Sequence, residues 1–150
     1  MLKNLQNKIP EIIMNTLETL EKGGFEGYLV GGCVRDLLMK NPPAGGPKDW
    51  DITTNATPEQ IIPLFEKTVY ENNFGTVAII NESVSDETLK VVEITPYRLE
   101  AKYSDFRHPD EVKFSNKLED DLKRRDFTVN ALALNSKGHL VDLFDGVKDI

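Results

Sequence analysis

The stretch Phe25–Lys40 reads FEGYLVGGCVRDLLMK and predicts a strand, a glycine turn and a short helix in direct succession. The apolar and aromatic run Phe25–Val30 is typical of a strand, Gly31-Gly32 breaks it, and Val34–Lys40 has the composition of a helix. Glycines at such a junction allow a tight turn and bring backbone N–H groups close to an anion. Taken alone, such a pair is more often a plain strand-to-helix turn that binds nothing.

The segments around this unit predict one α+β domain with a mixed sheet of about five strands flanked by helices. Apolar residues at helical spacing over Ile9–Leu20 indicate a first helix, which Gly23-Gly24 ends. Thr57 is the expected N-cap of another helix, which Pro63 shortens. The remaining expected elements are strands at 25–30, 49–53, 68–70, 76–81 and 89–95, a helix at 117–125, and a terminal hairpin of 132–134 with 141–143.

Composition excludes several classes of protein. The chain has 150 residues, enough for one domain with its own core, and Lys+Arg 18 against Asp+Glu 25 gives a net charge of −7. Such an acidic chain is a poor sequence-independent binder of nucleic acid, although an enzyme can still act on a polyanion. A single cysteine, Cys33, allows no internal disulfide, and the sequence has no apolar run long enough to span a bilayer. We expect a cytoplasmic protein without a membrane partner.

The segment Asp49-Trp50-Asp51 is a candidate metal site. On a strand, Asp49 and Asp51 would face the same way, roughly 6–7 Å apart along the strand, while Trp50 would face the core. Two carboxylates on one face can bind Mg²⁺, which keeps waters and recruits substrate phosphates. Mn²⁺ would also suit these oxygen ligands. An isolated Asp-x-Asp is more often a solvated strand edge.

Two further groups could take part in phosphate chemistry. The string Arg124–Asn130 contains two arginines suited to triphosphate oxygens, and Asp126 or Asn130 could bind a ribose hydroxyl. The alternative is a helix end whose basic residues complement the helix dipole. Glu93 lies in an otherwise apolar strand and is either a third metal-facing carboxylate or a partner for Arg98. Together with the glycine turn and the acid pair, these groups match what nucleotidyl transfer requires.

Several strings resemble, in the same order, the class II tRNA nucleotidyltransferase and poly(A) polymerase family. The most specific is RRDFTVNA at 124–131, preceded by GGCVRD at 31–36. The resemblance covers about Tyr28 to the last residue and implies a polymerase-β-type nucleotidyltransferase head, followed in such proteins by helical neck, body and tail regions. The other strings are DWDITT at 49–54, EITPYR at 93–98 and RHPDEVKF at 107–114.

The resemblance also implies roles for individual residues. Asp49 and Asp51 are similar to the metal-binding dyad, with Glu93 as a supporting acid. The segment 102–109 is similar to a loop involved in switching nucleotide specificity, and 142–150 to the hinge between head and neck. The residues that resemble the nucleotide-binding set are Gly31, Gly32 and Arg35 at the triphosphate and Arg125, Asp126 and Asn130 at the sugar and phosphate.

We therefore expect residues 1–150 to form the catalytic head of an enzyme that adds CMP and AMP from CTP and ATP to the 3′ end of tRNA. The resemblance implies that base-selecting residues and the main RNA contacts lie outside this chain. A bacterial poly(A) polymerase remains an alternative within the same class. A non-catalytic nucleotide-binding module is the alternative from another class, and a structural domain with merely solvated acids is a third.

Overall fold

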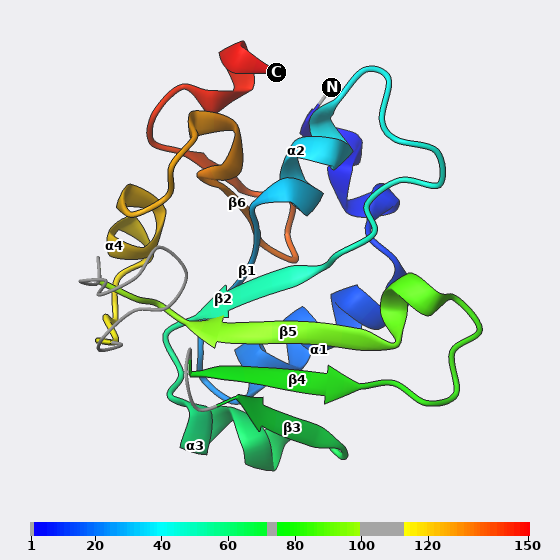
Figure 1. Cartoon of the computed structure of the whole chain (residues 1–150), viewed down its shortest axis with the longest axis vertical. Helices are drawn as coiled ribbons and strands as arrows, with labels where there is room; N and C mark the ends of the chain where they lie inside the picture. Colours follow the sequence, from blue (N-terminus) through cyan, green and yellow to red (C-terminus); the bar gives the residue numbers. More distant parts are fainter. Residues whose placement is uncertain (1, 72–74, 100–112) are drawn as a thin grey trace.

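The chain folds around one mixed β-sheet. The computed structural model describes residues 2–71, 75–99 and 113–150. Within these ranges seven strands form a sheet in the order β3-β4-β5-β2-β1-β6-β7, in which only the β2–β5 pair is parallel (Figure 1). The strands are β1 (Gly27–Val30), β2 (Asp51–Thr54), β3 (Thr68–Glu71), β4 (Thr76–Ile80), β5 (Val91–Pro96), β6 (Leu132–Leu134) and β7 (Leu140–Asp142).

The α+β class is confirmed, but the predicted number of about five strands is too low for the described part of the chain. The terminal hairpin forms as β6 and β7, and it also joins the main sheet because β6 pairs with β1, with Leu29 opposite Leu134. That pairing joins segments far apart in the sequence. Local hydrophobic patterns identify a hairpin but carry no information about which distant strand it will meet.

The helices begin and end close to the predicted positions. Gln60 accepts a hydrogen bond from the backbone N–H of Thr57 (2.9 Å), as expected at a helix start, and Pro63 lies in a 3₁₀ turn that ends the segment. The α-helices are α1 (Glu11–Lys22), α2 (Gly32–Leu38), α3 (Pro58–Ile61) and α4 (Leu118–Lys123), and the 3₁₀ helices are η1 (Leu2–Lys8), η2 (Ile62–Leu64), η3 (Glu87–Leu89), η4 (Thr128–Asn130) and η5 (Gly146–Asp149). No helix in the described ranges has the length and apolar character needed to cross a membrane.

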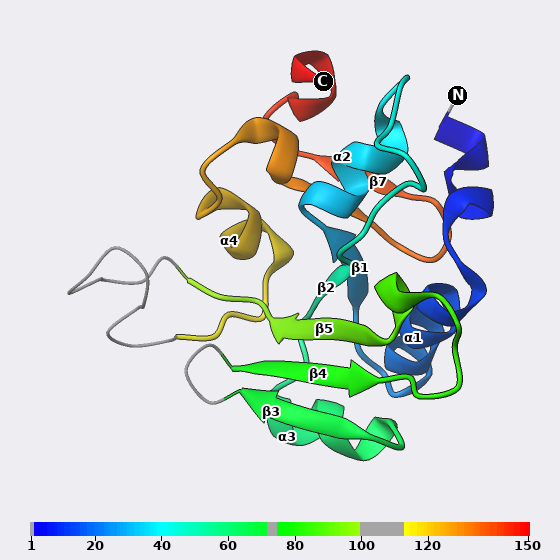
Figure 2. The same cartoon turned by 45° about the vertical axis from the view of Figure 1, so that its right-hand side comes forward.

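One face of the sheet packs on α1 and holds the main core. Ile13, Leu17 and Leu20 of α1 are fully buried against strand residues such as Leu29 and Ile52, and both views place α1 behind the strands (Figures 1 and 2). Burial of each such side chain contributes about 1.5–3 kcal/mol relative to exposure. This apolar layer fixes which side of each strand faces inward.

On the opposite face, the described part of the chain provides a cover at one end, where α4 lies. A smaller cluster forms there, in which Leu118 and Leu122 of α4 pack on Val30, Ala133 and Tyr97. Toward β2, β5 and β4 the same face carries polar side chains, because successive residues of a strand point to opposite sides. The fold therefore leaves a polar area beside α4, on strands whose other side is anchored in the core.

The segment before β2 departs from the prediction. The expected strand at 49–53 begins only at Asp51, because β1 ends at Val30 and its last residue pairs with Asp51. Gly31 turns the chain away with φ +76°, so no β1 residue lies opposite Asp49 or Trp50. Trp50 nevertheless packs into the core as predicted, with 4% of its surface exposed.

Candidate active site

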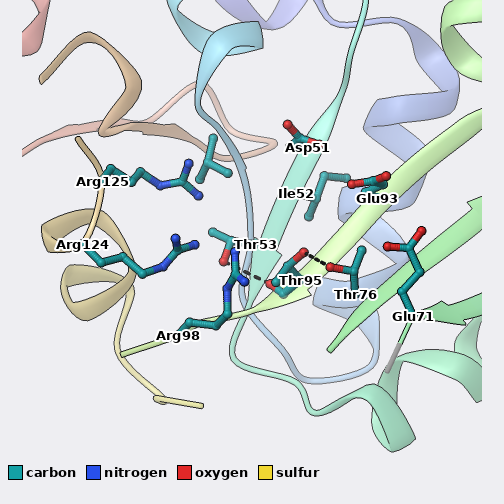
Figure 3. Close-up of a pocket in the computed structure, with 11 residues that line it drawn as sticks. Asp51, Ile52, Thr53, Glu71, Thr76, Glu93, Thr95, Arg98, Arg124 and Arg125 are labelled. Carbon is teal, nitrogen blue, oxygen red and sulfur yellow. Dashed lines mark hydrogen bonds between the residues drawn. The ribbon is translucent and has the colours of Figure 1, made fainter. Parts of the chain in front are cut away.

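A row of threonines forms the floor of the polar face. Thr53 on β2 and Thr95 on β5 are partners in the parallel register, and the Thr53 hydroxyl donates to the Thr95 carbonyl oxygen (3.1 Å). The hydroxyls of Thr95 and Thr76 are 3.0 Å apart (Figure 3). These contacts cross-link β2, β5 and β4 at the point where the acidic side chains emerge, so the floor of the site is held in place by three adjacent strands.

The predicted acids Asp49, Asp51 and Glu93, here called the acidic cluster, line one cavity of about 370 Å³. Asp51 and Glu93 are directly opposite each other in the β2–β5 pair, which places both on the polar face. The pKa of Asp51 is raised above its ordinary value. Burial is the main cause, the charge on Asp49 adds to it, and the charge on Arg125 acts in the opposite direction. Burial also raises the pKa of Glu93, and the charges on Asp51, Glu71 and Asp49 add to the shift.

The acidic cluster fits a hard divalent cation. Within the described residues no group of three or more His, Cys, Asp or Glu side chains is close enough to hold a metal by itself. Mg²⁺ does not require such a group, since it commonly takes one or two carboxylates and completes its shell with waters and substrate phosphates. Mutual repulsion among the acids, visible in the raised pKa of Glu93, is the condition that a bound cation would relieve.

The glycine turn lies under two guanidinium groups. Gly31 has φ +76° and ψ −141°, a conformation available almost only to glycine. A Cβ on Gly31 would lie 3.5 Å from Nη1 of Arg125, and a Cβ on Gly32 would lie 3.3 Å from Nη2 of Arg35. Gly31 is therefore required mainly by its φ, with the Arg125 guanidinium at contact distance, whereas the absence of a side chain at Gly32 leaves room for Arg35 of α2.

Arg35 also connects the turn to the second half of the predicted nucleotide-binding set. Its Nη1 donates to Oδ1 of Asn130 (3.0 Å), although the two residues are 95 positions apart. Its Nε contacts Asp36 at 3.2 Å. The structure thus brings together Gly31, Gly32, Arg35, Arg125 and Asn130. Of the predicted nucleotide-binding set, only Arg125 is among the residues lining the two cavities of the polar face, and Asp126 is exposed.

A second cavity, of about 350 Å³, separates positive from negative side chains. Arg98, Arg124 and Arg125 lie on one side of it, and Asp51, Glu71 and Glu93 on the other, with the threonines between them (Figure 3). Glu93 is thus surrounded by other carboxylates, which favours the metal-facing interpretation over the Arg98 partner. A cavity with this division of charge can hold a phosphate chain at one end and a cation at the other.

Sequence reasoning missed several residues of this site. The threonine row and Glu71 were predictable in principle, because Thr53 and Thr95 are two positions from Asp51 and Glu93 and so share their face. Glu71 is opposite Thr76 in the β3–β4 pair. The predicted specificity loop at 102–109 lies outside the described residues.

Comparisons with known proteins agree with the fold. CCA-adding enzymes from Lactobacillus delbrueckii subsp. bulgaricus and Enterococcus faecalis are each 48% identical to this chain, over 138 and 128 residues, covering 91% and 85% of it. A crystal structure of the Bacillus stearothermophilus CCA-adding enzyme in complex with CTP superposes with a TM-score of 0.73 at 33% identity, covering 93% of this chain.

The chain spans about a third of the length of the relatives it matches: 32% and 29% of the two curated proteins and 32% of the crystallised chain. The family model described as the poly A polymerase head domain matches residues 27–150, a range that runs from β1 to the last residue and includes the glycine turn, the acidic cluster and both arginines after α4. The chain therefore belongs to the poly A polymerase head domain family.

Proposed function

We propose that this chain is the catalytic head of a metal-dependent tRNA nucleotidyltransferase that adds CMP and AMP to the 3′ end of tRNA. The observation that carries the proposal is the cavity that has Asp51 and Glu93 on one side and Arg124 and Arg125 on the other. The similar proteins named above are CCA-adding enzymes, one of them crystallised with CTP. The main tRNA contacts and the choice of base are proposed to lie in parts of the enzyme outside this chain.

Asp49 and Asp51 are proposed to hold Mg²⁺, with Mn²⁺ as an alternative, and Glu93 to support them. A divalent cation at this site would neutralise charge on the phosphate oxygens and lower the pKa of the attacking hydroxyl. The carboxylates contribute a fixed arrangement of oxygen donors, since Asp51 and Glu93 are held opposite each other by the strand register. Glu93 lines the same cavity as Asp49 and Asp51, and its carboxylate is proposed to accept the hydroxyl proton there.

The arginines are proposed to bind the triphosphate. Arg35 and Arg125 lie over the glycine turn and can donate forked hydrogen bonds to phosphate oxygens. Asn130, which already accepts from Arg35, and Asp126 are proposed to contact the ribose. In the reaction the RNA 3′ oxygen forms a bond to the α-phosphorus, the bond from that phosphorus to the oxygen bridging to the β-phosphate breaks, and pyrophosphate leaves.

A second candidate from the same class is poly(A) polymerase activity, which the description of the matching family model favours. The two candidates differ in the number and identity of the nucleotides added. A head that binds nucleotide without transferring it is the remaining alternative. A cytoplasmic location stays a prediction from the sequence.

The experiment uses the full-length protein that the gene encodes, with Mg²⁺ and a tRNA that ends immediately before CCA. CTP alone, ATP alone and both together are supplied, and the products are resolved at single-nucleotide length. We expect addition of two C and one A when both nucleotides are present. A long ladder with ATP alone would indicate poly(A) polymerase instead, and binding of nucleotide without any product would indicate the non-catalytic module.

A further inference from the structure

A buried carboxylate, Asp121, lies behind the arginines of the site. Its side chain has no exposed surface, although it belongs to a short helix, α4, at the edge of the polar face. Oδ2 accepts a hydrogen bond from Nη2 of Arg125 (3.0 Å). Oδ1 accepts from Nη2 and Nε of Arg124 (3.1 and 3.3 Å) and from the backbone N–H of Arg98 (3.1 Å). Both oxygens are therefore occupied by donors from residues that line the cavity.

The arrangement leaves the arginine side of the cavity positive. One carboxylate faces two guanidinium groups, so the cluster keeps about one unit of positive charge toward the cavity. The side chains of Arg124 and Arg125 retain 18% and 20% exposure, whereas Asp121 has none. Asp121 thus binds the two arginines on their buried side. The exposed parts of both guanidinium groups stay turned toward the cavity.

The Arg125 guanidinium is in contact with Asp121. Arg125 itself lies just after the end of α4, whose last residue is Lys123. Its Nε is buried without a hydrogen-bond partner within the described residues, while its Nη2 is held by Asp121. The other end of the same guanidinium lies over Gly31, 3.5 Å from where a Cβ would be. The guanidinium thus lies between Asp121, which holds Nη2, and the glycine turn, toward which Nη1 points.

We propose that Asp121 is a positioning residue for nucleotide binding, which orients Arg125 toward the triphosphate. This inference rests on the proposed function, because it assigns the arginines to the nucleotide. Removing one partner of a buried ion pair also lowers stability. The test must therefore separate a loss of orientation from a loss of fold.

The neighbouring residue Asp120 offers a matched control. It belongs to the same helix and is half-buried. It accepts a hydrogen bond from the Ser115 hydroxyl (2.6 Å) and, among the described residues, forms no hydrogen bond or ion pair with Arg124 or Arg125. Asp121→Asn and Asp120→Asn remove the same charge from adjacent positions. Only the first removes an acceptor from Arg125.

The experiment measures the affinity of the full-length protein for CTP and ATP, together with kcat and KM for transfer to tRNA. Asp121→Asn, Arg125→Ala and the double variant are compared at a temperature where each is folded by circular dichroism. We expect Asp121→Asn to weaken nucleotide binding by about tenfold or more, because small misplacements of a binding group are costly. Asp120→Asn should bind as the wild type does, and the double variant should be no weaker than Arg125→Ala alone.

Three results would overturn the proposal. In the first, Asp121→Asn lowers the melting temperature while nucleotide affinity per folded molecule is unchanged. In the second, the losses of nucleotide affinity in Asp121→Asn and Arg125→Ala multiply in the double variant. If Asp121→Asn does not fold, Asp121→Glu replaces it, because this variant keeps the charge and moves the carboxylate by one methylene. Wild-type nucleotide affinity in Asp121→Glu is the third result that would overturn the proposal. A wild-type protein that neither binds nor transfers nucleotide would instead refute the proposed function, a distinct result.

Discussion

Asp51 and Glu93 are directly opposite each other across the parallel β2–β5 pair, and the charge on Asp51 contributes to the raised pKa of Glu93. The register of two strands, fixed by the buried residues Ile52 and Ile94 on the other face, therefore forces two carboxylates together. Such a pair is unfavourable for folding and useful for binding a cation. The first two predictions follow from this conflict.

Glu93→Gln should raise the melting temperature at pH 7–8. A carboxyl group whose pKa is raised on folding binds its proton more tightly in the folded state, so stability falls as pH rises from the ordinary carboxyl pKa through the raised one. The gain from the substitution should therefore disappear below about pH 4, where both states are protonated. Melting curves across this pH range measure it, and Glu18→Gln, on the exposed side of α1, is the control. A gain of equal size at every pH would contradict the account.

Divalent cations should stabilise the wild type and not the Asp51→Asn variant. A ligand that binds only the folded state raises its stability in proportion to the logarithm of ligand concentration. Mg²⁺ and Mn²⁺ titrations followed by melting temperature at pH 7.5 measure the effect, and EDTA should reverse it. An equal rise in both proteins would place the cation somewhere other than the acidic cluster.

Gly31→Ala should cost about 1–3 kcal/mol of stability through backbone strain and should also weaken nucleotide binding. The second effect is expected because the new methyl group would lie against the Arg125 guanidinium. Gly45→Ala is the control, since Gly45 also has a positive φ (+83°) but open space around its Cβ position. Chemical denaturation and nucleotide affinity separate the two effects. Equal nucleotide affinity in the two variants would argue against a role for the turn.

Gly146→Ala should destabilise the chain by about 3 kcal/mol, at the upper end of the usual cost of overpacking. A Cβ at Gly146 would be 2.2 Å from the carbonyl oxygen of Thr128, and backbone cannot move aside as a flexible side chain can. The control is Gly24→Ala, which has φ +91° but no neighbour within 4 Å. Gly24→Ala measures the cost of a positive φ alone, and a free energy of unfolding of Gly146→Ala close to that of the wild type would show that the close packing of η5 on η4 is not a constraint.

Much of the site was predictable from local sequence. The strand, glycine turn and helix at 27–38 form almost as expected, because glycine and apolar alternation act over a few residues. Proteins of the family that this chain resembles more often carry Gly-Gly at the positions of Asp145 and Gly146. Asp145 indeed adopts a left-handed conformation (φ 55°), which aspartate tolerates better than most residues.

Other features depend on contacts that no local pattern encodes. The pairing of β6 with β1, the start of β2 at Asp51 and the bond between Arg35 and Asn130 all join distant segments. Asp121 was indistinguishable in the sequence from its neighbours in LEDD, where acidic residues suggest only a solvated helix face. Its burial depends on how α4 packs against Val30 and Ala133.

The most direct test of the central claim, that the polar face carries out nucleotidyl transfer, is the rate of CMP and AMP incorporation into tRNA by full-length protein with single substitutions. We predict that Asp49→Asn and Asp51→Asn abolish incorporation while the circular dichroism spectrum stays that of the wild type. Asp86→Asn, an exposed aspartate at the start of η3 that lies outside the acidic cluster, should leave the rate unchanged. Near-normal incorporation by the Asp49→Asn or Asp51→Asn variant would contradict the account.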